Sequence, residues 1–199
     1  MSVTLIAGLG NPGREYAGTR HNLGFTVVDA LAAAEGLKWG LDSHFKSEIA
    51  RWDVRPRVTR LLVKPQTFMN DSGSALRALL DFHQAPVDSL IAVYDDLTID
   101  LGRVKVSVTG SAGGHNGVAS LLEHLGSGFI RYRLGIGAPR PAEMDIKDFV
   151  LGKFSTEQTT LIDQKLNTFV DGLRLLLNRG YTDAMNTLNR REQHEPDQA

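Results

Sequence analysis

The chain has 199 residues, no cysteine and a formal net charge of −1. That length can bury a sizeable core without cross-links, and the lack of cysteine excludes disulfides, zinc–thiolate sites and a cysteine nucleophile. The near-neutral charge does not indicate nucleic-acid binding, so any RNA surface must be a local patch of cations.

The first part of the chain predicts a strand, a helix and a hairpin. Residues 3–9 form a short apolar run that ends in a glycine-rich loop, which is typical of a buried strand. Apolar residues recur at helical spacing over 20–35, and Gly36 is a suitable stop. Residues 47–53 and 58–63 flank a polar turn and predict a hairpin.

A helix is expected after the glycine at position 73, followed by two strands. Its predicted apolar face consists of Leu76, Leu79, Leu80 and Phe82. Residues 90–94 read as a buried strand that ends in Asp95-Asp96, and residues 103–108 alternate as a strand with one buried face should.

The remaining elements follow a glycine-rich segment at 110–117. That segment leads into a predicted helix over 118–125, and residues 131–136 alternate again as a strand. Residues 156–178 predict a long amphipathic helix, and a short helix is expected over 182–188.

Strands and helices interleave, so the expected class is α/β. We expect a single domain over residues 1–190, with a mixed central β-sheet and helices on both faces, and a polar, disordered tail at 191–199. Residues 139–154 are polar and irregular, and either a lid or a long connection would fit them. Ligand sites in such sheets gather at the carboxyl ends of strands, where the Asn11 loop and Asp95 both lie.

The glycines at 8, 10 and 13 match the G-x-G-x-x-G pattern of dinucleotide-binding proteins. Pro12-Gly13 interrupts any helix start in that loop, and Asp29, the acid at the right distance, lies inside a helical stretch instead of ending a strand. The pattern is therefore better explained as a structural turn that carries a functional asparagine. The chain also has no G-x-S-x-G elbow and no H-E-x-x-H pair, which disfavours serine-hydrolase and zinc chemistry of those types.

Several spaced motifs together carry a specific resemblance. Gly-Leu-Gly-Asn-Pro-Gly-x-x-Tyr at 8–16 is followed by Thr-Arg-His-Asn-x-Gly at 19–24, and then by Lys-Pro-Gln-Thr-Phe-Met-Asn-x-Ser-Gly at 64–73. Gly-Gly-His-Asn-Gly stands at 113–117, ahead of the strand at 131–137. In this order the motifs resemble those of the bacterial-type peptidyl-tRNA hydrolase family.

Such an enzyme needs a water, a base that deprotonates it and donors for the developing oxyanion. His21 is the best candidate base because imidazole titrates near neutral pH. A carboxylate on its other ring nitrogen would fix the tautomer, and Asp95 is the candidate, although Asp96 leaves that assignment open by one position.

The resemblance further implies that Asn11 and Asn70 line the catalytic mouth and that Asn116 holds the peptide or the terminal adenosine. Other residues expected to form the site, as walls or substrate contacts, are Tyr16, Phe68, Met69, Gly113 and His115. Each of these residue types has a common structural use, since asparagines form turns and caps and His115 could cap the next helix.

The resemblance implies peptidyl-tRNA as the partner, contacted at its acceptor stem and CCA end. Phosphate contacts need cations, and Lys105, Arg131 and Arg133 stand on two strand-like segments, with Arg131 and Arg133 on one face. Ser107 occupies a place where family members can carry a second lysine, so we expect one cation fewer at the phosphate-binding site than in those members. We expect no cofactor, no metal and a monomer.

Two other functions compete with hydrolysis as explanations of the sequence. A non-catalytic RNA-binding member of the same fold would bind structured RNA without turnover, and a nucleotide-dependent oxidoreductase would rest on the glycine loop alone. No stretch approaches the roughly 18 apolar residues of a membrane span, and the first residues lack the basic segment of a secretory signal. The expected location is therefore the cytoplasm, away from membranes, with an organellar matrix left open.

Overall fold

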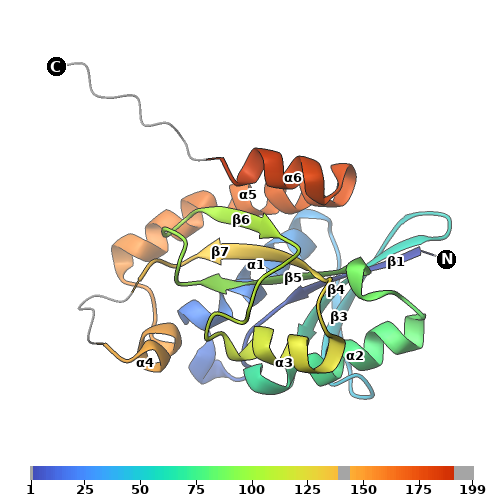
Figure 1. Ribbon diagram of the computed structural model, residues 1–199, viewed down its shortest axis with the longest axis horizontal. Coiled ribbons are helices and arrows are strands. Elements are labelled where there is room, and N and C mark those ends of the chain that lie inside the picture. Colours follow the sequence, from blue (N-terminus) through green and yellow to red (C-terminus); the bar gives the residue numbers. More distant parts are fainter. Residues whose placement is uncertain (1, 139–143, 191–199) are drawn as a thin grey trace.

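A computed structural model describes residues 2–138 and 144–190 of the chain. The strands form one seven-stranded sheet with the order β2-β3-β4-β1-β5-β7-β6 (Figure 1). They are β1 (Ser2–Gly8), β2 (Trp39–Asp42), β3 (Ser47–Arg55), β4 (Val58–Pro65), β5 (Leu90–Asp96), β6 (Val104–Ser107) and β7 (Ile130–Gly135). The central strands β4, β1, β5 and β7 are parallel. Strands β3 and β6 pair antiparallel with β4 and β7, and the edge strand β2 pairs antiparallel with β3.

Helices cover both faces of this sheet, as Figure 1 shows. They are α1 (Leu23–Ala34), α2 (Ser72–His83), α3 (Asn116–Leu125), α4 (Ile146–Leu151), α5 (Thr156–Arg179) and α6 (Tyr181–Leu188). The expected α/β class, with a mixed central sheet between helices, is confirmed.

Two apolar cores separate along the two faces of the sheet. In β1, Ile6 packs on the side of α1, α5 and α6, while its neighbours Leu5 and Ala7 pack on the side of α2 and α3. Successive side chains of a strand point to opposite faces, so a strand covered on both sides must be apolar throughout. This is why β1 and β5 could be recognised as continuous apolar runs.

The structure adds two elements and corrects one residue. The short edge strand β2 was not predicted, and α4 forms within the segment that was expected to be irregular. Phe82 is 67% exposed, so its placement on the buried face of α2 was wrong; its ring instead stands edge-on to Phe45 at the surface. The other three predicted face residues of α2 are fully buried.

The predicted tail at 191–199 and the first residues of the segment 139–154 lie outside the described residues. Among the helices that the structure does describe, none combines the length and apolar character that crossing a bilayer requires.

Candidate active site

A cavity of about 720 Å³ opens where the carboxyl ends of the parallel strands meet their loops. The loop after β1, the turns that precede α1 and α2, the end of β5, the glycine-rich loop before α3, strand β7 and helix α4 all contribute to its wall. Its polar and charged lining includes Asn11, His21, Asn70, Asp95, Asp96, His115, Asn116, Arg131 and Arg133. The five side chains expected to meet around one gap, His21, Asp95 and the three asparagines, therefore share this cavity.

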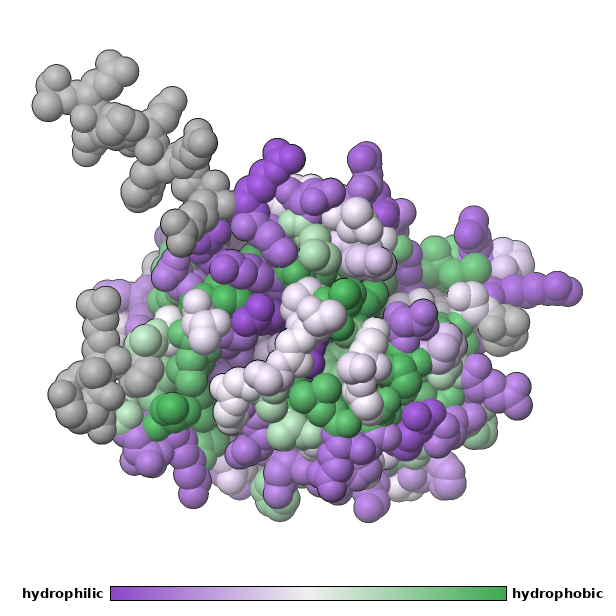
Figure 2. Space-filling model, in the orientation of Figure 1, coloured by the Kyte–Doolittle hydropathy of each residue, from purple (hydrophilic) through white to green (hydrophobic). Residues whose placement is uncertain are grey.

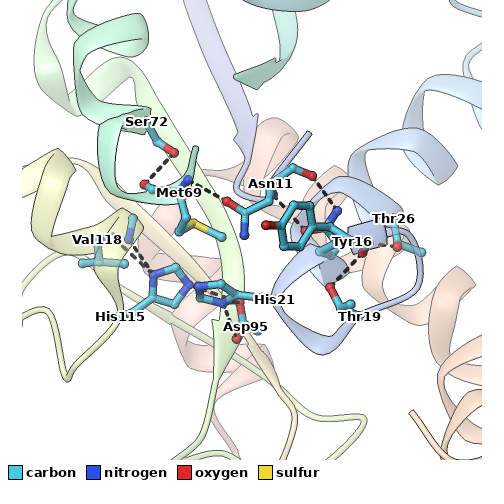
Figure 3. A network of polar contacts seen from close by, with 12 residues as sticks. Asn11, Tyr16, Thr19, His21, Thr26, Met69, Ser72, Asp95, His115 and Val118 are labelled. Atoms are coloured by element: carbon cyan, nitrogen blue, oxygen red, sulfur yellow. Dashed lines mark hydrogen bonds and ion pairs between the residues drawn. The ribbon is translucent and has the colours of Figure 1, made fainter. Parts of the chain in front are cut away.

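The centre of the cavity is a histidine–carboxylate pair (Figure 3). His21 lies in the short 3-10 helix Arg20–Asn22, and Asp95 lies at the end of β5. His21 Nδ1 lies 3.0 Å from Asp95 Oδ1 and 3.1 Å from Oδ2. A carboxylate can only accept, so Nδ1 carries the proton and donates it, which leaves the lone pair of the neutral ring on Nε2.

A second histidine contacts the same carboxylate. His115 Nε2 lies 3.1 Å from Asp95 Oδ1, while His115 Nδ1 accepts the backbone N–H groups of Gly117 and Val118. These two acceptor contacts place the ring proton on Nε2, which donates it to Asp95. His115 therefore caps α3 and also orients the carboxylate that faces His21.

Asp95 is buried, with 3% of its surface exposed. Burial alone would raise the pKa of its carboxyl, but His115 and His21 hold that pKa well below the usual range. The carboxylate thus stays ionised at neutral pH and can stabilise positive charge on His21.

His21, Asp95 and His115 also offer three ligand atoms within 4.8 Å of one another, as a metal site would. A metal at His115 Nε2 would need that nitrogen deprotonated, which would move the ring proton to Nδ1. Nδ1 already faces two backbone N–H donors, so a proton there would meet both of them. The donor set therefore fits a hydrogen-bonded relay better than a metal centre.

Three hydrogen bonds fix Asn11 through its backbone N–H, its backbone carbonyl and its side-chain oxygen. Its backbone N–H donates to Asn22 Oδ1 at 2.8 Å, and Asn22 Nδ2 donates to its carbonyl at 2.9 Å. The backbone N–H of Met69 donates to Asn11 Oδ1 at 2.7 Å, which settles the orientation of the amide. The Asn11 Nδ2 group, drawn in Figure 3, remains for the cavity, which Asn11 lines.

The rim of the cavity is formed by exposed residues ahead of α2 and at the start of α3. Phe68 and Asn70 precede α2, with Asn70 in the 3-10 helix Met69–Asp71, while Gly113 lies in the glycine-rich loop and Asn116 is the first residue of α3. Phe68 is 61% exposed although it lines the cavity, so an apolar edge stands beside polar groups. Met69 contributes a buried wall.

The cations are arranged less simply than the sequence suggested. Arg133 Nε donates to Asp96 Oδ2 at 2.9 Å, so Asp96 is an ion-pair partner and not an idle neighbour of Asp95. Arg131 is buried and holds the glycine-rich loop through the carbonyls of Gly110 and Ser111.

Two expected site residues do not line the cavity. Lys105 lies on the edge strand β6, opposite Arg133 of β7 in the strand register, and so one strand farther from β5 than Arg133. Ser107 of β6 does line the cavity. Tyr16 is half-buried in the 3-10 helix Arg14–Tyr16, where its carbonyl accepts from the Thr19 hydroxyl.

Both the sequence and the fold match known proteins. The family model for peptidyl-tRNA hydrolase matches residues 5–196. The chain belongs to the peptidyl-tRNA hydrolase family.

Relatives and solved structures of that family match over nearly the full length. The peptidyl-tRNA hydrolase of Synechococcus sp. (strain JA-3-3Ab) is 42% identical, and the match covers 99% of this chain and 87% of that one. The peptidyl-tRNA hydrolase of Anaeromyxobacter sp. (strain K) is 44% identical, covering 94% and 96% of the two chains. A crystal structure of peptidyl-tRNA hydrolase from Acinetobacter baumannii superposes with a TM-score of 0.87 at 34% identity, with 96% of each chain covered.

Some residues that build or line this cavity were not predicted from the sequence. Asn22 stood inside a quoted motif, but nothing in the motif indicated that its side chain would bind the Asn11 backbone. Arg131 was considered only as an RNA contact, although its burial makes it a clamp on the glycine-rich loop. The wall made by α4 contributes Ile146, Lys147, Val150 and Leu151, for which the sequence offered no signal beyond a short apolar run. On the face seen in Figure 2, apolar side chains reach the surface beside α4 and around α3, between polar areas.

Proposed function

We propose that the chain hydrolyses the ester that joins a peptide to the 3′ end of tRNA, with His21 as general base. The observation that carries this proposal is the His21–Asp95 pair. Because Asp95 binds the Nδ1 proton, Nε2 of His21 keeps a lone pair that can accept a proton from water.

In the proposed reaction, a water between His21 Nε2 and the ester carbonyl attacks the carbonyl carbon. Its proton moves to Nε2, and the carboxylate of Asp95 stabilises the imidazolium that forms. The ester C–O bond then breaks, and the proton on Nε2 passes to the departing ribose oxygen. Peptide acid and free tRNA are the products, and one water is consumed.

The Asn11 amide supports the charge that develops on the carbonyl oxygen. Its Oδ1 is already bound to the Met69 backbone, so its Nδ2 donates to whatever occupies the cavity. A donor held in place before the reaction stabilises an oxyanion without reorganisation. Asn70 and Asn116 on the rim have both donors and acceptors, and we assign them to the water and to the substrate.

The remaining assignments concern the tRNA. Arg133, with Lys105 behind it at the sheet edge, would receive phosphate, and the apolar edge at Phe68 would pack against a base or a peptide side chain. His115 would act on the substrate only indirectly, through Asp95.

The test is a turnover assay on an N-acetylated aminoacyl-tRNA, which measures release of free tRNA. Wild type should turn over, and His21→Ala should be slower by about 10²- to 10⁴-fold, the usual size of general-base help. His44→Ala is the matched control, because His44 is exposed and does not line the cavity. A non-catalytic RNA-binding protein would instead bind tRNA and release nothing in any variant.

A further inference from the structure

Arg20, the residue before His21, makes hydrogen bonds to residues 129 and 138 positions away in the chain. Its Nη1 donates to the carbonyl of Phe149 at 3.1 Å, and its Nη2 donates to Gln158 Oε1 at 2.9 Å. Its guanidinium carbon lies 4.2 Å from the ring centre of Phe149 and 5.2 Å from that of Phe154. One side chain therefore touches the end of α4, the connection after it and the first turn of α5.

The backbone around Arg20 makes the same connection. The Arg20 N–H donates to the carbonyl of Gly152 at 3.1 Å, and Thr19 forms an antiparallel bridge with Lys153. Space is tight at this junction, since a Cβ on Gly152 would lie 3.2 Å from Arg20 Nη1. Gln158 Oε1 also accepts from the backbone of Ser155 in the capping box of α5, so Arg20 binds a group that is itself fixed.

The two ends of this connection both belong to the cavity. On one side, His21 follows Arg20 directly and points to Asp95. On the other side, α4 supplies Ile146, Lys147, Val150 and Leu151 to the lining. The α4 helix has six residues and is too short to be stable without packing.

We propose that Arg20 is a positioning residue that holds α4, one wall of the cavity, at a fixed distance from the turn that carries His21. The reaction needs the base and the bound ester within a small tolerance, because even a 1 Å misplacement can cost on the order of 100-fold in rate. This inference rests on the proposed role of His21. Whether Arg20 fixes the position of α4 can, however, be measured without any substrate.

The substrate-free measurement uses spin labels attached to introduced cysteines. The chain has no native cysteine, so labels attach only at the chosen positions. Cysteines at Asp148 of α4 and Glu123 of α3 would carry the labels, since both residues are exposed and neither lines the cavity. In wild type the α3–α4 distance distribution should be narrow. In Arg20→Met it should broaden or shift, and in Arg20→Lys, which keeps the charge and one donor, it should be partly restored.

Arg60 offers a matched control. Its Nη2 donates to the Leu177 carbonyl at 2.8 Å and to Asn178 Oδ1 at 3.1 Å, and its guanidinium carbon lies 4.7 Å from the Trp52 ring centre. It thus joins β4 to α5 with the same kinds of contact, but does not line the cavity. Arg60→Met should lower the melting temperature about as much as Arg20→Met does, without changing the α3–α4 distance or kcat.

Arg20→Met should lower kcat by about 10- to 100-fold, with Arg20→Lys between it and wild type. If Arg20→Met keeps the wild-type distance distribution, or keeps the kcat of the Arg60→Met control, the inference is overturned. A wild-type chain that fails to release tRNA would contradict the proposed function instead, and the label distances would still decide whether Arg20 holds α4.

Discussion

His21 Nδ1 lies 3.0 Å from Asp95 Oδ1, and this one contact joins the turn before α1 to the end of β5. It fixes the tautomer of His21 and leaves the other ring nitrogen free. His115 Nε2 contacts the same oxygen at 3.1 Å, so Asp95 is held from two sides.

Asp95→Asn should lower kcat by about 10²- to 10⁴-fold. The carboxylate accepts from both histidines, and an amide at this place offers one acceptor and a donor that would face a ring proton. His21 would then favour the wrong tautomer. Steady-state turnover of an N-acetylated aminoacyl-tRNA measures the effect, and a variant with wild-type kcat would refute the assignment of Asp95.

The low pKa of Asp95 makes a prediction about acid stability. In the unfolded chain this carboxyl titrates near its ordinary value of about 3.9, whereas in the folded chain its pKa lies well below that. The contribution of Asp95 to the free energy of unfolding is therefore complete above the unfolded pKa and is lost as pH falls toward the folded pKa.

Urea unfolding at pH 6, 5, 4 and 3 checks this prediction for wild type and Asp95→Asn. The difference in the free energy of unfolding should shrink below about pH 4, because only wild type carries the titrating group. A difference that stays constant down to pH 3 would contradict the low pKa.

Asn11→Asp and Asn11→Ala separate the two ends of one amide. The aspartate keeps an oxygen for the Met69 N–H but replaces the free donor in the cavity with negative charge. Both variants should lower kcat by about 10²- to 10³-fold, the usual effect of losing one oxyanion donor. Only Asn11→Ala should also destabilise the fold, by about 1–3 kcal/mol, because the buried Met69 N–H loses its acceptor. Equal stability of the two variants in urea would count against this division of roles.

Arg133→Gln should weaken tRNA binding and reduce the slope of log K against log salt by about 1. The substitution also frees the Asp96 carboxylate, which would then repel phosphate. Arg55→Gln, at an exposed position of β3 outside the cavity lining, is the control. Filter binding over a salt series gives both slopes, and an Arg133→Gln slope equal to the control would remove Arg133 from the phosphate contact.

The sequence predicted those parts of the fold that depend on continuous patterns. Strands β1 and β5 are buried on both sides, so each is an apolar run whatever its partners are. The edge strand β2 has only four residues, too few for an alternating pattern to stand out, and its Leu41 is exposed although it is apolar. Phe82 was misplaced because helical spacing defines a face but not its limits, and this residue lies outside the buried part of α2.

The site was predictable to the extent that motifs carry it. His21 and Asp95 stand 74 positions apart, and only the ordered motifs indicated that they would meet. Two other contacts depend on the direction in which a side chain points. Asn22 fixes the backbone of Asn11, and Arg131 holds the glycine-rich loop. Direction is set by tertiary packing and leaves no periodic trace in one sequence.

The central claim is that His21 acts on bound substrate as the base for water. Single-turnover cleavage, with enzyme in excess over an N-acetylated aminoacyl-tRNA, tests it most directly because binding and chemistry are measured apart. His21→Ala should bind the tRNA as wild type does and cleave it at least about 100-fold more slowly. Cleavage within about tenfold of the wild-type rate would contradict the claim, because general-base help is larger than that.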